Sequence, residues 1–129
     1  MSPSSALQIA QDLIRIRTVN PPGNEAAAMR YLGAMLEDAG FDVKHYEISA
    51  GRRSIVAIHG GTSSELPLCF TGHLDTVPLG HETWRFDPFG GDVAGGKLHG
   101  RGASDMKGGI GAIVSAAIQA AAKPITRGL

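Results

Sequence analysis

Two residues near the middle of the chain have the types and spacing of a metal site. Residues 68–78, LCFTGHLDTVP, begin as an apolar strand and end with His73 and, two positions later, Asp75. If the strand continues, both side chains lie on one face. A neutral imidazole is a good zinc ligand, and a nearby carboxylate fixes its orientation and raises its basicity. The alternative is a histidine that caps a strand end, followed by an aspartate that starts a turn.

A second candidate ligand, Asp105, lies in the stretch GRGASDMKGG at residues 100–109. The aspartate directly precedes a predicted helix, so the plain alternative is an N-cap carboxylate. Five glycines lie between Gly100 and Gly111, more than a cap requires. They indicate a backbone that bends sharply and lets a ligand or another element approach closely.

Other catalytic chemistries find little support. Residues 91–97 spell G-x-x-x-x-G-K, but Leu98 stands where a phosphate-binding loop needs Ser or Thr. No predicted strand is followed by G-x-G-x-x-G, and the G-x-S-x-G motif of a serine hydrolase is absent. The single cysteine, Cys69, is predicted to be buried in a strand, which makes it a poor nucleophile.

Three helices and three strands are expected to position these residues. The first helix starts at Ser5, with Gln8 at capping-box spacing, and ends before the NPPG run at residues 20–23. The second helix is capped by Asn24 and terminated by Gly40. The third is a buried, glycine-containing helix in residues 106–123. The predicted strands cover residues 41–48, 54–60 and 67–73.

The last two predicted strands are near-continuous apolar runs, as in interior strands covered on both faces. A long glycine-rich loop follows at residues 78–102, with a hairpin in its second half. Helices that alternate with buried strands predict an α/β fold, with helices covering a mostly parallel or mixed sheet.

Composition limits the possible partners. The chain has 129 residues, is 43% hydrophobic and has twelve basic and twelve acidic residues, so its formal net charge is zero. Global charge therefore favours neither nucleic acid nor an anionic membrane. The N-terminal residues lack a signal-peptide pattern, and one cysteine suits a reducing compartment. We expect a cytoplasmic protein.

Together, the motifs resemble one enzyme family. TGHLDTVP, WRFDPFGG and GKLHGRGASDMKGG occur in this order, and RTVNPPGNE precedes them. This pattern resembles the zinc amidohydrolase and peptidase family of acetylornithine deacetylase, succinyl-diaminopimelate desuccinylase, aminoacylase and glutamate carboxypeptidase. The resemblance covers essentially the whole chain, and RTVNPPGNE looks most like the deacetylase and desuccinylase branch.

The resemblance implies a role for each matching residue. His73 would ligate one zinc ion, Asp105 would bridge two, and Asp75 would be the catalytic aspartate that orients His73. The peptide bond from Asp105 to Met106 would be cis. A complete site would hold two Zn²⁺ ions about 3.5–4 Å apart that activate a water molecule for amide hydrolysis. Co²⁺ or Mn²⁺ would also suit these ligands.

The same resemblance implies that residues 1–129 are the N-terminal part of a catalytic domain. The family's paired glutamates, its later metal ligands and its dimerisation or lid domain have no counterpart here. We therefore expect the chain alone to bind zinc weakly and to be inactive. The complete protein would act on an N-acyl amino acid or small peptide, with a homodimer as one possible assembly. The alternative is a non-catalytic α/β binding or scaffold module derived from such an enzyme.

Overall fold

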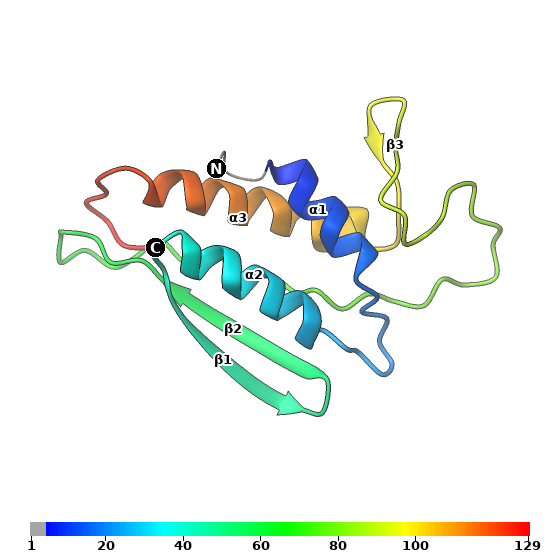
Figure 1. Ribbon diagram of the computed structural model, residues 1–129, viewed down its shortest axis with the longest axis horizontal. Helices are drawn as coiled ribbons and strands as arrows, with labels where there is room; N and C mark the ends of the chain where they lie inside the picture. The colour runs from blue at the N-terminus through cyan, green and yellow to red at the C-terminus, as the bar shows by residue number, and fades with distance from the viewer. Residues whose placement is uncertain (1–4) are drawn as a thin grey trace.

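A computed structural model describes residues 5–129, which form an α/β arrangement (Figure 1). The predicted α/β class is therefore confirmed. Residues 1–4 belong to the N-terminal stretch that lacks a signal-peptide pattern, and they lie outside the described part of the chain. In chain order the elements are α1 (Ala6–Arg15), α2 (Ala26–Asp38), β1 (Asp42–Ser49), β2 (Arg52–Ile58), β3 (Val93–Ala94), β4 (Lys97–Leu98), the short wide turn η1 (Ala103–Lys107) and α3 (Gly108–Ala121).

Helix α1 begins as predicted. Ser5 adopts extended backbone angles, and its hydroxyl accepts a hydrogen bond from the amide of Gln8 at 3.1 Å. This satisfies one of the free N–H groups of the first turn. The apolar positions recur at helical spacing and form a buried stripe of Ile9, Ala10, Leu13 and Ile14. This stripe joins the hydrophobic core.

Helix α2 ends where predicted, but its N-cap position is one residue after the predicted cap, Asn24. Asn24 has a φ of 88° and makes no cap; Glu25 occupies the N-cap position without a side-chain cap bond. The first-turn amide of Ala26 instead donates to the carbonyl of Gly51, at 3.0 Å, so a tertiary contact replaces the cap. At the other end, Gly40 has a φ of 90° and terminates the helix, as glycine does without a Cβ penalty.

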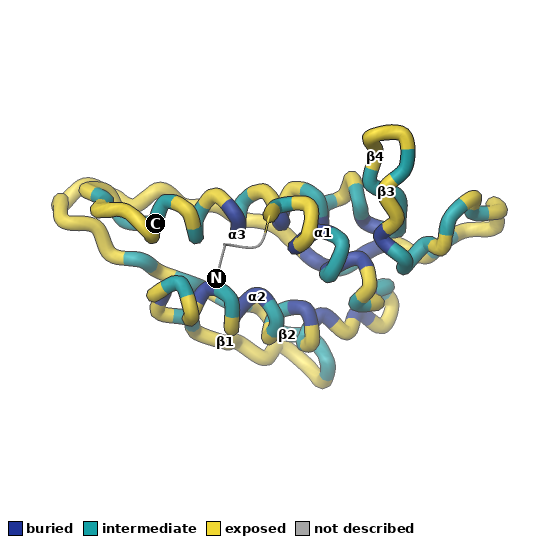
Figure 2. Tube along the Cα trace, turned by 45° about the horizontal axis from the view of Figure 1, so that its top comes forward, coloured by how far each residue is buried: buried dark blue, intermediate teal, exposed yellow. Residues whose placement is uncertain are grey.

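Strands β1 and β2 form an antiparallel hairpin beside α2 (Figure 1). Val43 pairs with Ala57, and His45 with Ile55; Val43, Ile55 and Ala57 pack against the core. The opposite face carries exposed apolar side chains: Tyr46, Ile48, Val56 and Ile58. Strand β2 is therefore covered on one face, and the predicted cover on both faces is wrong. Figure 2 colours most of β1 as exposed.

Residues 67–73 do not form the predicted strand. They run extended, and Leu68 donates to the carbonyl of Gly128, at 2.9 Å. A strand requires a continuous ladder of partners, and the described residues place only isolated bonds along this segment. Cys69 is consequently exposed, contrary to the predicted burial. Both sheets among the described residues are antiparallel pairs, and a single parallel bridge between Val19 and Thr76 lies outside them.

Helix α3 packs against α1 (Figure 1). Ile110 and Val114 contribute to the core, and the helix passes so close to α1 that a Cβ at Gly111 would overlap the carbonyl oxygen of Ala6. The close approach at Gly111 is therefore to another helix, whereas the glycines of this helix were expected to approach a sheet or ligand. The predicted hairpin is β3–β4, whose turn residues Gly95 and Gly96 both have positive φ. No helix in residues 5–129 is long and apolar enough to cross a membrane.

The contact at Gly111 predicts opposite effects for two substitutions on one helix. Gly111→Ala should destabilise the chain by about 1–3 kcal/mol because the added methyl forces α1 and α3 apart. Gly109→Ala adds its methyl where Met106 Cε, at 3.7 Å, is in ordinary contact, and should stabilise the chain by up to about 1 kcal/mol. Urea unfolding measures both. Equal stabilisation by both would contradict the packing.

Candidate metal centre

Residues 73–76 are anchored to the N-terminal part of the chain. Leu74 is buried, and its carbonyl accepts a hydrogen bond from the Thr18 hydroxyl. The amide of Thr76 donates to the carbonyl of Thr18 at 2.9 Å, and that of Asn20 donates to the carbonyl of Thr76 at 2.8 Å. These bonds fix the backbone on both sides of Asp75. His73 and Asp75 therefore project from a held segment, although that segment is not a regular strand.

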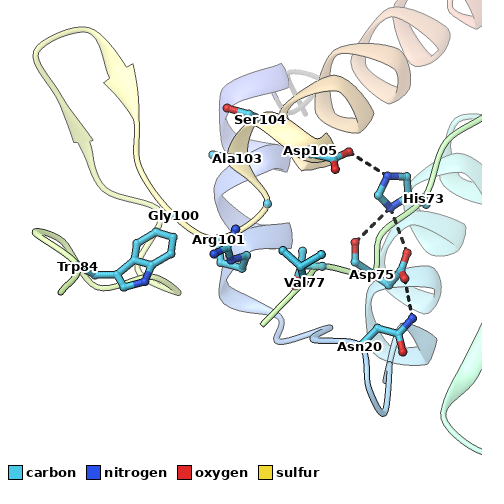
Figure 3. Close-up of a pocket in the computed structure, with 12 residues that line it drawn as sticks. Asn20, His73, Asp75, Val77, Trp84, Gly100, Arg101, Ala103, Ser104 and Asp105 are labelled. Atoms are coloured by element: carbon cyan, nitrogen blue, oxygen red, sulfur yellow. Dashed lines mark hydrogen bonds and ion pairs between the residues drawn. The ribbon is translucent and has the colours of Figure 1, made fainter. Parts of the chain in front are cut away.

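The three predicted site residues meet (Figure 3). His73 Nδ1 lies 3.0 Å from Asp75 Oδ1, and His73 Nε2 lies 3.0 Å from Asp105 Oδ1. The exposed fractions of the side chains are 47% for His73, 31% for Asp75 and 84% for Asp105. The imidazole thus lies between a partly shielded carboxylate and an exposed one, and a ligand can reach the exposed side.

Asp105 lies in η1, the irregular turn that directly precedes α3. Its φ and ψ of −126° and 93° are not helical, and the peptide bond to Met106 is cis, as the family resemblance implied. Asp105 does not cap α3, whose N-cap position is Lys107. The Lys107 amide closes the turn by donating to the carbonyl of Gly102 at 2.8 Å. The carboxylate is therefore free to face His73.

A further layer of side chains lies behind Asp75, and it was missed from the sequence. Asn20 Nδ2 donates to Asp75 Oδ2 at 2.9 Å, and Arg52 Nη2 lies 3.9 Å from the same oxygen. Arg52 also binds the buried carboxylate of Glu25, at 2.8 Å and 3.3 Å. RTVNPPGNE contains Asn20 and Glu25, and its family likeness was the available signal. Nothing in the sequence linked Arg52 to these residues.

These contacts act on the ionisation of His73 and Asp75. Burial of the ring disfavours imidazolium, but hydrogen bonds to Asp105 and Asp75 outweigh it and raise the pKa of His73. The hydrogen bond from Asn20 has the largest effect on the pKa of Asp75, and it lowers that pKa. Burial opposes it by raising the pKa, and interactions with His73 and the charge of Arg52 lower the pKa further. Both side chains are therefore favoured in their charged forms in the absence of a metal ion.

The raised pKa of His73 predicts a pH dependence of stability. The folded chain holds the imidazolium more strongly than the unfolded chain, so the contribution to stability is fully present below pH 6.5, the ordinary pKa of a histidine side chain. It should disappear as the pH rises through the higher pKa of the folded state. Urea unfolding in chelator, compared between wild type and His73→Gln, tests this. The stability difference should shrink with rising pH; a constant difference would contradict it.

A cavity of about 400 Å³ opens beside these residues (Figure 3). Trp84 and Arg101 line it across from His73 and Asp105, and the Arg101 guanidinium lies 4.9 Å from the centroid of the Trp84 ring. The predicted long loop at residues 78–102 thus forms one wall of this cavity. The cavity has space for a small ligand next to the imidazole and carboxylate.

The pair His73 and Asp105 fits a zinc ion geometrically. Two ligand atoms about 2.0–2.1 Å from one tetrahedral zinc lie about 3.3 Å apart. The observed Nε2–Oδ1 distance is 3.0 Å, so a small opening would admit the ion in place of the shared proton. Residues 5–129 hold no group of three or more His, Cys, Asp or Glu side chains arranged for a metal. Among the described residues, His73 and Asp105 are the two candidate ligands that converge.

Comparison with known protein families shows which family this chain resembles. Residues 69–128, which contain His73, Asp75 and Asp105, match the family described as Peptidase family M20/M25/M40. The family recognised from the motifs is thereby confirmed. Particular proteins and one solved structure are also similar to this chain.

The chain is 45% identical over 118 residues to succinyl-diaminopimelate desuccinylase of Rhodopseudomonas palustris (strain HaA2), covering 89% of this chain and 30% of that protein. The Methylobacterium sp. (strain 4-46) enzyme of the same name is 44% identical over 117 residues, covering 88% and 29%. The crystal structure of human carnosine dipeptidase 1 superposes with a TM-score of 0.73 and 27% identity, covering 91% of this chain and 28% of the dipeptidase. The chain thus spans under a third of each.

Proposed function

We propose that this chain provides the N-terminal half-site of a metal-dependent amidohydrolase that cleaves the amide of an N-acyl amino acid or small peptide. The observation that supports this most is the convergence of His73 and Asp105, with their ligand atoms 3.0 Å apart and Asp75 behind the ring. A scaffold module would have no need for this convergence. The named desuccinylases and dipeptidase agree with the reaction class.

Each residue has a distinct task in the proposed site. His73 and Asp105 would hold a metal ion, and the exposed carboxylate of Asp105 would leave room for a second ion beside it. Asp75 accepts the Nδ1 proton of His73 and keeps Nε2 available as a ligand. When bound, the metal supplies Lewis-acid polarisation of the scissile carbonyl and lowers the pKa of water. Zn²⁺ is the proposed ion, and Co²⁺ or Mn²⁺ also suits imidazole and carboxylate.

The site as described is half of the proposed machinery. Catalytic zinc commonly has three protein ligands, whereas two converge here. We propose that residues 1–129 are the N-terminal part of the catalytic domain and that further ligands and the general base belong to other parts of a complete enzyme. The 129-residue chain by itself should then bind zinc weakly and should not turn over substrate.

A chimaeric enzyme tests this function. This chain would replace the matching N-terminal segment of the Rhodopseudomonas palustris desuccinylase, and hydrolysis of N-succinyl-diaminopimelate would be followed with added zinc. The expected result is metal-dependent hydrolysis that His73→Ala abolishes. A folded, zinc-loaded chimaera without activity would overturn the proposal. Circular dichroism and zinc content establish folding and loading independently of activity.

A further inference from the structure

Asp75 divides its two carboxylate oxygens between different partners. Oδ1 faces His73 Nδ1 at 3.0 Å, beside the Asp75 backbone carbonyl at 3.1 Å from the same nitrogen, whereas Oδ2 accepts the amide proton of Asn20 at 2.9 Å (Figure 3). A carboxylate bound at one oxygen only would be free to rotate about its terminal torsion. With Oδ2 held by Asn20, the direction of Oδ1 is set by the protein.

Asn20 is itself held on both sides by backbone bonds. Its amide donates to the carbonyl of Thr76 at 2.8 Å, and Gly23 donates to the carbonyl of Val19 at 2.8 Å. The first bond joins Asn20 to the segment that carries Asp75. The carboxamide of Asn20 is thus placed relative to Asp75 by main-chain geometry and does not depend on a bound metal ion.

The hairpin turn between β1 and β2 supports this arrangement. Glu25 is only 5% exposed and is paired with Arg52, which follows that turn. Arg52 lies against the backbone of Gly23, where an added Cβ would come within 2.7 Å of its Nε. The loop that carries Asn20 is therefore tied to a third segment of the chain.

We propose that Asn20 is a positioning residue that acts through Asp75 to select the Nδ1–H tautomer of His73. The selection matters because Asp105 Oδ1 competes for a proton at the other ring nitrogen, 3.0 Å away. A proton on Nε2 would occupy the lone pair that a metal ion needs. Asn20 thereby favours the ring form that leaves Nε2 open.

The consequence for metal binding rests on the proposed function, whereas the tautomer is a property of the metal-free chain. Loss of a group that orients a ligand typically lowers metal affinity about 10–100-fold. Asn20→Ala should show a loss in this range for zinc. It should also shift part of the His73 population from the Nδ1–H form to the other neutral form, while the Asp75 carbonyl, 3.1 Å from Nδ1, retains the remainder.

The experiment records ¹⁵N resonances of the imidazole nitrogens in the metal-free 129-residue chain, at a pH above the titration of the ring. His73 is assigned by its absence in His73→Gln. Asn20→Ala removes the donor, and Asn20→Leu removes it while filling the space. Gln119→Ala is the matched control, because its amide donates to Ser115 on the same helix, α3. Zinc affinity of each folded variant is then measured by calorimetry.

In wild type and Gln119→Ala, the ¹⁵N pattern should be that of the Nδ1–H form, and in both Asn20 variants it should be mixed. An unchanged ¹⁵N pattern in folded Asn20→Leu would overturn the positioning role. If the pattern changes but wild type binds no zinc, the positioning role stands and the proposed metal function fails. If the ¹⁵N pattern changes and zinc affinity falls, both stand.

Discussion

Replacing Asp105 with asparagine should lower the zinc affinity of the chain about a hundredfold, because one of the two proposed ligands loses its charge. The carboxylate oxygen lies 3.0 Å from His73 Nε2, and the side chain is 84% exposed. The substitution should therefore leave the fold intact, since little packing is lost. Calorimetric titration with zinc, together with urea unfolding, separates the two effects.

The control for this prediction is Asp42→Asn, which removes an exposed carboxylate on β1, away from the site. Its zinc affinity should equal that of wild type. Similar losses for both variants would indicate non-specific attraction of zinc to negative charge. Full affinity in Asp105→Asn would remove Asp105 from the metal centre.

Replacing Lys107 with alanine should have the largest effect on stability, a loss of about 3–5 kcal/mol. Lys107 is fully buried, and its ammonium donates to the carbonyls of Leu13 and Ile16, both at 2.9 Å. Burial lowers its pKa to about 8. The charge lies at the C-terminal end of α1, where the helix dipole favours a cation. Truncation leaves a cavity and two carbonyls without this donor.

Two further variants separate these causes. Lys107→Met retains most of the volume and should recover part of the lost stability, because only the hydrogen bonds and the charge are missing. Lys123→Ala truncates an exposed lysine after α3 and should change the unfolding free energy by less than about 0.5 kcal/mol. Urea unfolding is the measurement for all three. Equal effects at Lys107 and Lys123 would contradict the buried anchor.

Local sequence signals predicted the helices and the second hairpin well. The Ser5 cap, the Gly40 terminator and the turn at Gly95 and Gly96 each depend on the conformational preference of a residue and its immediate neighbours. Asn24 failed as a cap because Gly51, distant in sequence, satisfies the helix amide. A contact between distant segments was decisive there, and no local pattern reports it.

Residues 67–73 show the same limit for strands. Their apolar run predicts a covered strand, yet strand formation depends on partners, and the described residues supply few. The burial predicted for Cys69 failed for the same reason. The candidate site was more predictable because His73, Asp75 and Asp105 lie in two recognisable motifs. Asn20 and Arg52 reach Asp75 only through the folded arrangement of three segments.

The central claim is that His73 and Asp105 bind a metal ion together. Native mass spectrometry of the purified 129-residue chain with added zinc tests it most directly, with His73→Ala measured in parallel. The expected result is a specifically bound zinc in wild type, of weak affinity on the order of 10–100 µM, that is lost in His73→Ala. Equal zinc occupancy in both, or none in wild type, would contradict the proposed metal centre.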